Sequence, residues 1–240
     1  MPLQTALRMV YPPRCLSCGD TVDSEFGLCG ECWRETPFTG GLVCDCCGLP
    51  LPGAETDETV LCDDCLTLPR PWGRGRAAMV YRDNGRKLVL ALKHGDRHDI
   101  VRPAAAWMAR AARPILQEKM LIAPIPLHWL RMLKRRFNQS ALLAGALADE
   151  VAMPWCPDLL QRPRRTVPLE GRTREERFET MADAITVHPK RRRRLIGRQV
   201  LLVDDVMTSG ATLAAATEAC LSAGATGVSV VTLARVAKDA

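Results

Sequence analysis

Two consecutive acids, Asp204 and Asp205, stand between an apolar run at residues 200–203 and a turn of small residues. The apolar run is typical of a buried parallel strand, and residues 209–220, rich in alanine, are typical of a following helix. Open α/β sheets bind ligands at the carboxyl ends of their strands, where both acids would lie. Two adjacent carboxylates at such an edge suit sugar hydroxyls or a divalent metal.

The turn after the acids has the composition of a phosphate site. At the start of a helix, backbone N–H groups and hydroxyls can surround an anion. The residues in a position to do so are Thr208, Ser209, Gly210, Ala211 and Thr212. The sequence therefore predicts a ligand that carries a phosphate and, beside it, either sugar hydroxyls or a divalent metal. The alternative is an ordinary buried strand followed by an acidic turn.

Eight of the eleven cysteines form four Cys-x-x-Cys pairs, a spacing typical of tetrahedral zinc sites. No export signal is evident, so disulfides are not expected. Pairing in sequence order predicts two structural zinc ions, one held by Cys15, Cys18, Cys29 and Cys32 and one by Cys44, Cys47, Cys62 and Cys65. A cross-braced arrangement of alternate pairs is the other possibility. Cys46 is a spare thiol, and Cys156 and Cys220 are expected in the core.

The 240-residue chain is 47% apolar, which is enough for a globular core, and it has no apolar run long enough to span a bilayer. Residues 1–10 are too short and too polar for a secretory signal, so we expect a cytoplasmic protein. The net charge is +6, with basic runs at residues 131–136 and 190–194. Such runs are either solvated surface or contacts for nucleic acid or a polyphosphate.

The segments that could position the acids, the phosphate turn and the cysteines alternate between strand and helix patterns. We expect a metal-stapled module at residues 1–70 and a second domain at residues 71–240, joined by a proline-rich linker at residues 68–73. Strands are expected at residues 76–81, 121–126, 184–187, 199–203 and 227–233, helices at 84–93, 100–117 and 129–151, and a loop at 162–177. Asn84 could cap the first of these helices. The alternation predicts an α/β fold with a parallel sheet flanked by helices.

A second group of donors follows the strand expected at residues 121–126. Arg131, Arg135, Asn138 and Gln139 would lie just beyond the strand end, where they could meet a diphosphate. Arginine suits this ligand because its guanidinium group matches phosphate oxygens. Lys93 is a further candidate for the diphosphate. The alternatives are a basic helix face and a surface lysine whose stem covers apolar atoms.

The Asp-Asp motif resembles the phosphoribosyl-diphosphate (PRPP) binding motif of type I phosphoribosyltransferases. The chain as a whole resembles the ComF family, which joins a double zinc ribbon to a phosphoribosyltransferase-like domain. Besides the cysteine quartets and the acids, the matching features are Tyr81, Leu92-Lys93-x-Gly95, Pro-x-Pro-Leu-His at residues 124–128, and Phe137-Asn138-Gln139. The resemblance implies that Asp204 and Asp205 hold the ribose hydroxyls and that residues 208–212 hold the 5-phosphate. It also implies that Arg164 and Arg177 belong to a loop that closes over the ligand.

The resemblance implies pentosyl transfer from PRPP with Mg²⁺, catalysed mainly by electrostatic stabilisation of the leaving diphosphate. It also implies a link to competence and DNA uptake. A module that binds single-stranded DNA is therefore the second hypothesis, favoured by the ribbons and basic runs and opposed by an aromatic content of only 5%. A third hypothesis keeps PRPP binding without the chemistry, as a sensor of nucleotide pools.

Overall fold

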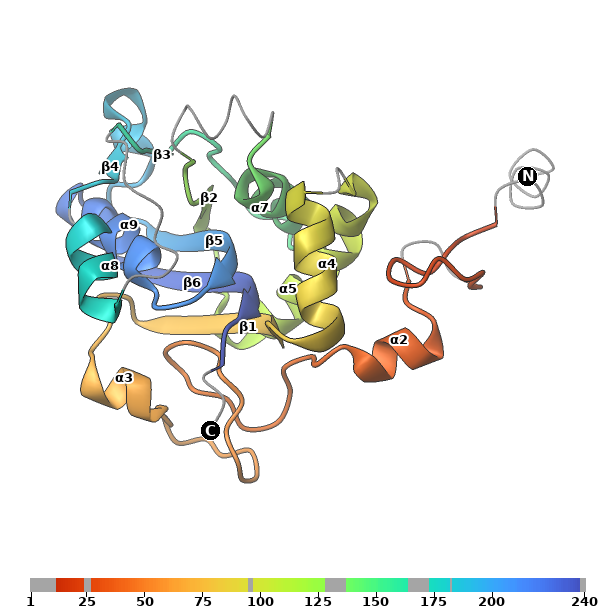
Figure 1. Cartoon of the computed structure of the whole chain (residues 1–240). Coiled ribbons are helices and arrows are strands. Elements are labelled where there is room, and N and C mark those ends of the chain that lie inside the picture. Colours follow the sequence, from red (N-terminus) through yellow and green to blue (C-terminus); the bar gives the residue numbers. More distant parts are fainter. Residues whose placement is uncertain are drawn as a thin grey trace.

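The computed structural model describes residues 12–23, 27–94, 97–127, 137–163, 173–181 and 183–237. Its centre is a four-stranded parallel sheet in the order β1-β6-β5-β2 (Figure 1). The strands are β1 (Arg74–Val80), β2 (Leu121–Pro124), β5 (Gln199–Met207) and β6 (Gly227–Arg235). The predicted parallel α/β sheet is therefore confirmed.

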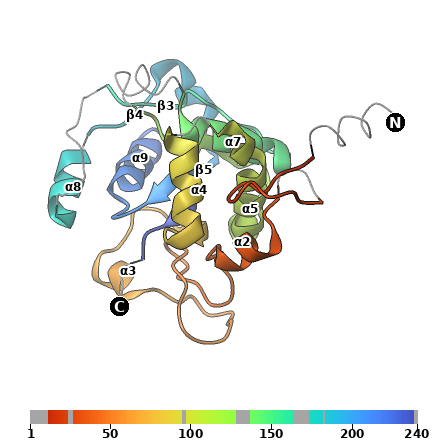
Figure 2. The ribbon, with the colours of Figure 1, turned by 45° about the vertical axis from the view of Figure 1, so that its right-hand side comes forward.

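Helices cover both faces of this sheet because alternate residues of each strand point to opposite sides. In β5, Leu201 and Val203 belong to a core shared with α4 (Asp83–His94), α5 (Val101–Ala112) and α7 (Gln139–Glu150). Val200 and Leu202 belong to a second core, shared with α9 (Ala211–Ser222). Figure 2 shows α4, α5 and α7 together on one side of the molecule and α9 on the other.

Several smaller elements differ from the expectation. The strand expected at residues 184–187 is only β4 (Thr186–Val187), which pairs antiparallel with β3 (Leu160–Gln161) outside the main sheet. Residues 164–172 of the expected loop lie outside the described part of the chain, but α8 (Arg174–Met181) makes the end of that segment helical. Short 3-10 turns complete the chain at η1 (His98–Ile100), η2 (Arg113–Ile115) and η3 (Pro189–Arg194).

Two asparagines change the helix boundaries. Residues 128–136 lie outside the described part, and α7 begins only at Gln139 because the Asn138 side chain accepts a hydrogen bond from the Ser140 N–H and so caps the helix. Asn84 does not cap α4 but lies inside it. Its buried amide donates to the Cys32 carbonyl and to the Thr36 hydroxyl, at 3.0 and 2.7 Å, and so joins the helix to the N-terminal cysteine region.

The two cysteine quartets lie on opposite faces of the sheet. The first, with α2 (Gly30–Glu35), adjoins the α4 and α5 side, where Leu16 enters the core. The second, with α3 (Asp63–Thr67), contributes its cysteines to the α9 core. Figure 1 accordingly places α2 and α3 at different sides of the molecule. Among the described helices, none has the length and apolar character needed to cross a membrane.

Candidate functional site

The two acids lie near the end of β5, between the first turn of α7 and the last turn of α4. The Ser140 hydroxyl and the Asp205 backbone N–H both donate to Asp204 Oδ1, at 2.8 and 2.9 Å. Lys93 Nζ, from α4, lies 3.1 Å from Asp205 Oδ2. Asp205 is buried and Asp204 is half-buried, so both carboxylates are held in fixed orientations by neighbouring elements.

Burial, and then the negative charge of Asp205, raise the pKa of Asp204 to about 7, although the Ser140 hydroxyl and Lys93 act in the opposite direction. Asp204 therefore changes protonation near neutral pH, where an ordinary aspartate is fully ionised. Its second oxygen, Oδ2, receives no hydrogen bond from any residue that the structure describes. The carboxyl group can thus donate to or accept from a ligand hydroxyl.

The turn after β5 has the backbone geometry of an anion site. Gly210 has a φ of 83° and is the N-cap of α9, so it offers no side chain to occupy the free N–H groups of the first turn. Within the turn, the Ala211 N–H makes only a long contact of 3.4 Å with the Ser209 hydroxyl. Thr208 is exposed and Ser209 half-buried, so both hydroxyls are near solvent. A phosphate fits this combination of hydroxyls, N–H groups and helix dipole.

Sequence reasoning missed three residues of this region. Arg70 donates to the Ser209 carbonyl at 2.6 Å, and Arg235 donates to the Thr208 carbonyl at 2.8 Å. Both bring positive charge to the phosphate turn. Ser140 is the third, and its only signal in the sequence was a hydroxyl directly after the Asn-Gln pair. No spacing rule pointed to either arginine.

Of the other predicted site residues, some lie beside the acids, whereas the rest lie on α8 or outside the described residues. Asn138 is fully engaged in the scaffold, because it caps α7 and its amide donates to the Ile125 carbonyl at 3.0 Å. The Gln139 amide approaches the Lys93 carbonyl at 3.4 Å. These two side chains thereby connect β2, α4 and α7 around the acids. Arg177 lies on α8, and the remaining candidates, Arg131, Arg135 and Arg164, fall outside the described residues.

The cysteines form two separate clusters that follow the sequence order. In each quartet, the four sulfur atoms lie within 4.8 Å of one another, which confirms sequential pairing over the cross-braced alternative. The Sγ atoms of Cys18 and Cys29 are 3.7 Å apart, as are those of Cys47 and Cys62. Tetrahedral zinc with bonds of about 2.3 Å requires sulfur separations of about 3.8 Å, so both quartets fit the metal.

Comparison with known proteins agrees with this architecture. The chain matches family models for a double zinc ribbon domain at residues 6–66 and a phosphoribosyl transferase domain at residues 138–240. A structure of glutamine PRPP amidotransferase from B. subtilis covers 60% of this chain and 30% of its own, with a TM-score of 0.40 and 17% identity. At that level the structural likeness adds nothing to the sequence matches.

Two sequence relatives extend over most of the chain. Competence protein F of Haemophilus influenzae is 26% identical over 206 residues, which cover 83% of this chain and 87% of that protein. The DNA utilization protein YhgH of Escherichia coli (strain K12) is 30% identical over 215 residues, which cover 88% of this chain and 91% of that protein. The chain therefore belongs to the ComF/YhgH family, in which a double zinc ribbon precedes a phosphoribosyltransferase domain.

Proposed function

We propose that this protein binds PRPP together with Mg²⁺ at the carboxyl end of β5. The observation that carries the proposal is the joint placement of the Asp204–Asp205 pair and the left-handed Gly210 at the start of α9. The acids supply acceptors for sugar hydroxyls, and the turn supplies donors for a phosphate. Arg70 and Arg235 behind the turn favour an anion over a neutral ligand.

Each part of PRPP has a set of candidate residues. The ribose hydroxyls would meet Asp204 and Asp205, and the 5-phosphate would meet residues 208–212. The diphosphate would lie toward Lys93, with Arg131 and Arg135 as further donors. Asn138 and Gln139 would shape this side. Mg²⁺ would neutralise diphosphate charge, with the acids as nearby oxygen ligands. Arg164 and Arg177 would take part in closing the site over the ligand.

The proposal divides the chain at about residue 70, with the ribbons before the boundary and the sugar-phosphate site after it.

For pentosyl transfer, the protein must stabilise the departing diphosphate, and Lys93 is the described cation nearest the acids. Its pairing with Asp205 keeps that charge in place before the ligand arrives. Release of diphosphate from PRPP in the presence of a panel of nucleobases would establish transfer. Binding without release would instead favour the sensor.

Isothermal titration calorimetry with Mg²⁺ and PRPP tests the binding step. We expect wild-type protein to bind, and the double variant Asp204→Asn with Asp205→Asn to bind much more weakly. An exposed acid of α3, Asp63, provides the control, and Asp63→Asn should bind as wild type. Absence of binding by wild-type protein would exclude both the transferase and the sensor.

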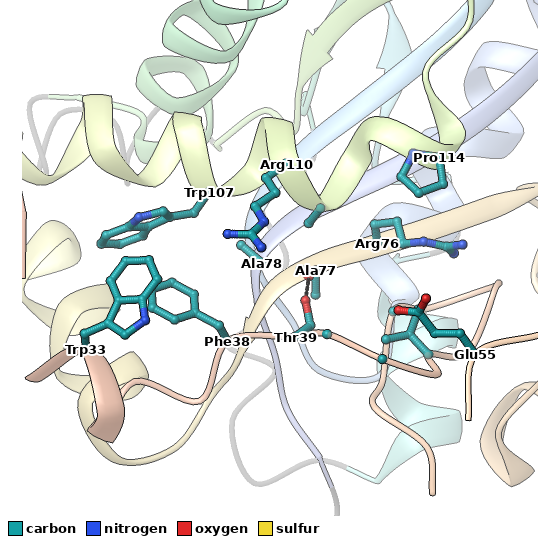
Figure 3. A pocket seen from close by; sticks show the side chains of 15 residues that line it. Trp33, Phe38, Thr39, Glu55, Arg76, Ala77, Ala78, Trp107, Arg110 and Pro114 are labelled. Atoms are coloured by element: carbon teal, nitrogen blue, oxygen red, sulfur yellow. Dashed lines mark hydrogen bonds between the residues drawn. The ribbon is translucent and has the colours of Figure 1, made fainter. Parts of the chain in front are cut away.

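A groove lined by both ribbons, β1 and α5 favours a second candidate function, binding of single-stranded nucleic acid. The groove has a volume of about 530 Å³. Figure 3 shows Trp107 and Arg110 projecting from α5 toward Trp33 and Phe38. The ring centres of Trp33 and Phe38 are 4.5 Å apart, and those of Phe38 and Trp107 are 5.1 Å apart. Aromatic rings beside an arginine are what a stacked base and its phosphate require.

The exposure of the side chains supports this groove over the other tryptophans and over the basic run at residues 190–194. Trp33 is 45% exposed, whereas Trp72 is 3% exposed and cannot stack on a base, and Trp129 lies outside the described residues. The Arg110 side chain makes no hydrogen bond or ion pair with any residue described. The basic run at residues 190–194 follows β4, on the side of the molecule away from α2 (Figure 1).

The relatives named for DNA utilization and competence add weight to this candidate. Fluorescence anisotropy with a labelled single strand at several salt concentrations would test it. We expect a steep salt dependence and a loss of roughly 1–3 kcal/mol for Trp33→Ala. Leu66→Ala, which removes another exposed apolar side chain that does not line the groove, is the control. Equal binding by wild type, Trp33→Ala and Arg110→Ala would exclude the groove.

A further inference from the structure

The second zinc ribbon packs directly behind the turn that follows β5. Trp72 donates from its indole N–H to the carbonyl of Cys46, inside the second quartet, at 2.7 Å. The same ring closes over Gly210, because a Cβ atom added there would lie 3.0 Å from the Trp72 ring. The ribbon and the phosphate turn thus share one buried tryptophan.

Arg70, in the segment between the ribbon and β1, holds the turn at a second point. Its Nη1 donates to the Ser209 carbonyl at 2.6 Å. The guanidinium carbon lies 5.7 Å from the centre of the Trp72 ring and 5.8 Å from that of Phe178 on α8. Its Nε and Nη2 atoms are buried and have no hydrogen-bond partner in the described part of the chain. The arginine is therefore fixed by two aromatic rings and one carbonyl.

Arg235, at the end of β6, holds the turn at a third point. It is 3% exposed, and its Nη1 donates to the carbonyls of Thr208 and Met207 at 2.8 and 3.4 Å. Its Nη2 lies 3.7 Å from Asp64 Oδ2. Asp64 belongs to α3, between the last two cysteines of the second quartet. A continuous path of contacts therefore leads from that quartet to the turn.

The geometry of the peptide group links these carbonyl contacts to the direction of the N–H groups in the turn. In a trans peptide, the C=O and the N–H of the next residue point in opposite directions. Arginines that hold the carbonyls of Thr208 and Ser209 from behind therefore direct the N–H groups of Ser209 and Gly210 to the other side. Those N–H groups are among the donors proposed for the 5-phosphate.

We propose that Arg70 and Arg235 are positioning residues for the sugar-phosphate turn, through which the second zinc ribbon sets the affinity for the 5-phosphate. This inference rests on the proposed PRPP site and assigns the ribbon a part in it. The first ribbon has no such contact among the described residues, since its hydrogen bonds and those of the segment after it lead to α4, to Arg97 and to β1.

Two matched pairs of variants test the inference by calorimetry with Mg-PRPP and, separately, with ribose 5-phosphate. Arg70→Ala removes the contact with the turn, whereas Arg74→Ala removes an arginine that binds Asp45 of the same ribbon and the Pro114 carbonyl. Asp64→Asn weakens the anchor of Arg235, and Asp63→Asn changes its exposed neighbour. We expect roughly 10-fold weaker binding of both ligands for Arg70→Ala and Asp64→Asn, and less than about 2-fold change for the two controls.

Nuclear magnetic resonance provides a readout that needs no ligand. Order parameters of the Ser209 and Gly210 N–H groups should fall in Arg70→Ala, while those of β5 stay unchanged. If wild-type protein binds neither ligand, the proposed function is wrong, and the order parameters alone decide whether Arg70 orders the turn. If wild type binds and Arg70→Ala has the same affinity and the same order parameters, the inference is wrong while the PRPP site stands.

Discussion

The titration of Asp204 gives a prediction that needs no ligand. Its folded-state pKa of about 7 lies above the ordinary value of 3.8. Between about pH 4 and about pH 7, the folded protein therefore keeps a proton that the unfolded chain has lost, and its stability falls as the pH rises through this window. An asparagine at this position cannot ionise, but its amide oxygen can still accept from Ser140 and from the Asp205 N–H. Asp204→Asn should therefore remove this pH dependence.

The magnitude follows from the size of the shift. A rise from 3.8 to about 7 corresponds to at most about 4 kcal/mol, and the partial exposure of Asp204 reduces this to about 1–3 kcal/mol. Because the folded pKa lies near 7, about 1 kcal/mol of the effect falls between about pH 6 and about pH 8.5. At the lower pH the unfolded wild-type chain has already lost its proton, so the variant should already be the more stable protein, and its advantage should grow by this amount at the higher pH.

Urea unfolding of wild type and Asp204→Asn at these two pH values, with zinc present, measures the difference. Titrating groups away from the site contribute equally to both proteins, so the change in the difference reports Asp204 together with its interaction with Asp205. Asp63→Asn, at an exposed position of α3, should show the same stability difference from wild type at both pH values. A pH-independent difference for Asp204→Asn would refute the argument that burial and Asp205 raise the Asp204 pKa.

Three further predictions concern the scaffold. Gly210→Ala should lower the free energy of thermal unfolding by about 1–2 kcal/mol and weaken PRPP binding, because the φ of Gly210 is 83° and the new Cβ would lie 3.0 Å from Trp72. Unchanged affinity would contradict this packing. Asp45→Ala should lower the free energy of unfolding in urea by about 2–4 kcal/mol, since it removes the carboxylate 2.8 Å from the buried Arg76 and leaves that charge only backbone carbonyls; a loss below about 0.5 kcal/mol would show that the pair is not structural. Metal analysis should find two zinc ions per chain, and a strong chelator should lower the melting temperature; one ion or none would contradict the paired quartets.

The functional residues that could be predicted from the sequence are those whose partners lie close to them in the chain. Each Cys-x-x-Cys pair brings two ligands together within one turn, and Asp204 to Gly210 span a single strand-to-helix connection, so spacing alone indicates their chemistry. The boundary of α7 was wrong because a helix-like pattern continued across Asn138, whose side chain instead caps the helix at Gln139. Local competition between a cap and a continuing helix is not visible in periodicity.

The supporting contacts could not be predicted because they join distant parts of the chain. Arg70 and Ser209 are 139 residues apart, and Ser140 and Asp204 are 64 residues apart. Asn84 looked like a helix cap, but it serves a contact with Cys32 across 52 residues. Such pairs depend on how the ribbons pack on the two faces of the sheet, which no spacing rule in the sequence specifies.

A crystal structure of the full chain with Mg²⁺ and PRPP tests the central claim most directly. The account predicts the 5-phosphate on the N–H groups and hydroxyls of residues 208–212, with the ribose hydroxyls on Asp204 and Asp205. PRPP bound at another part of the molecule, or an unoccupied β5 edge in crystals grown at saturating ligand, would contradict it.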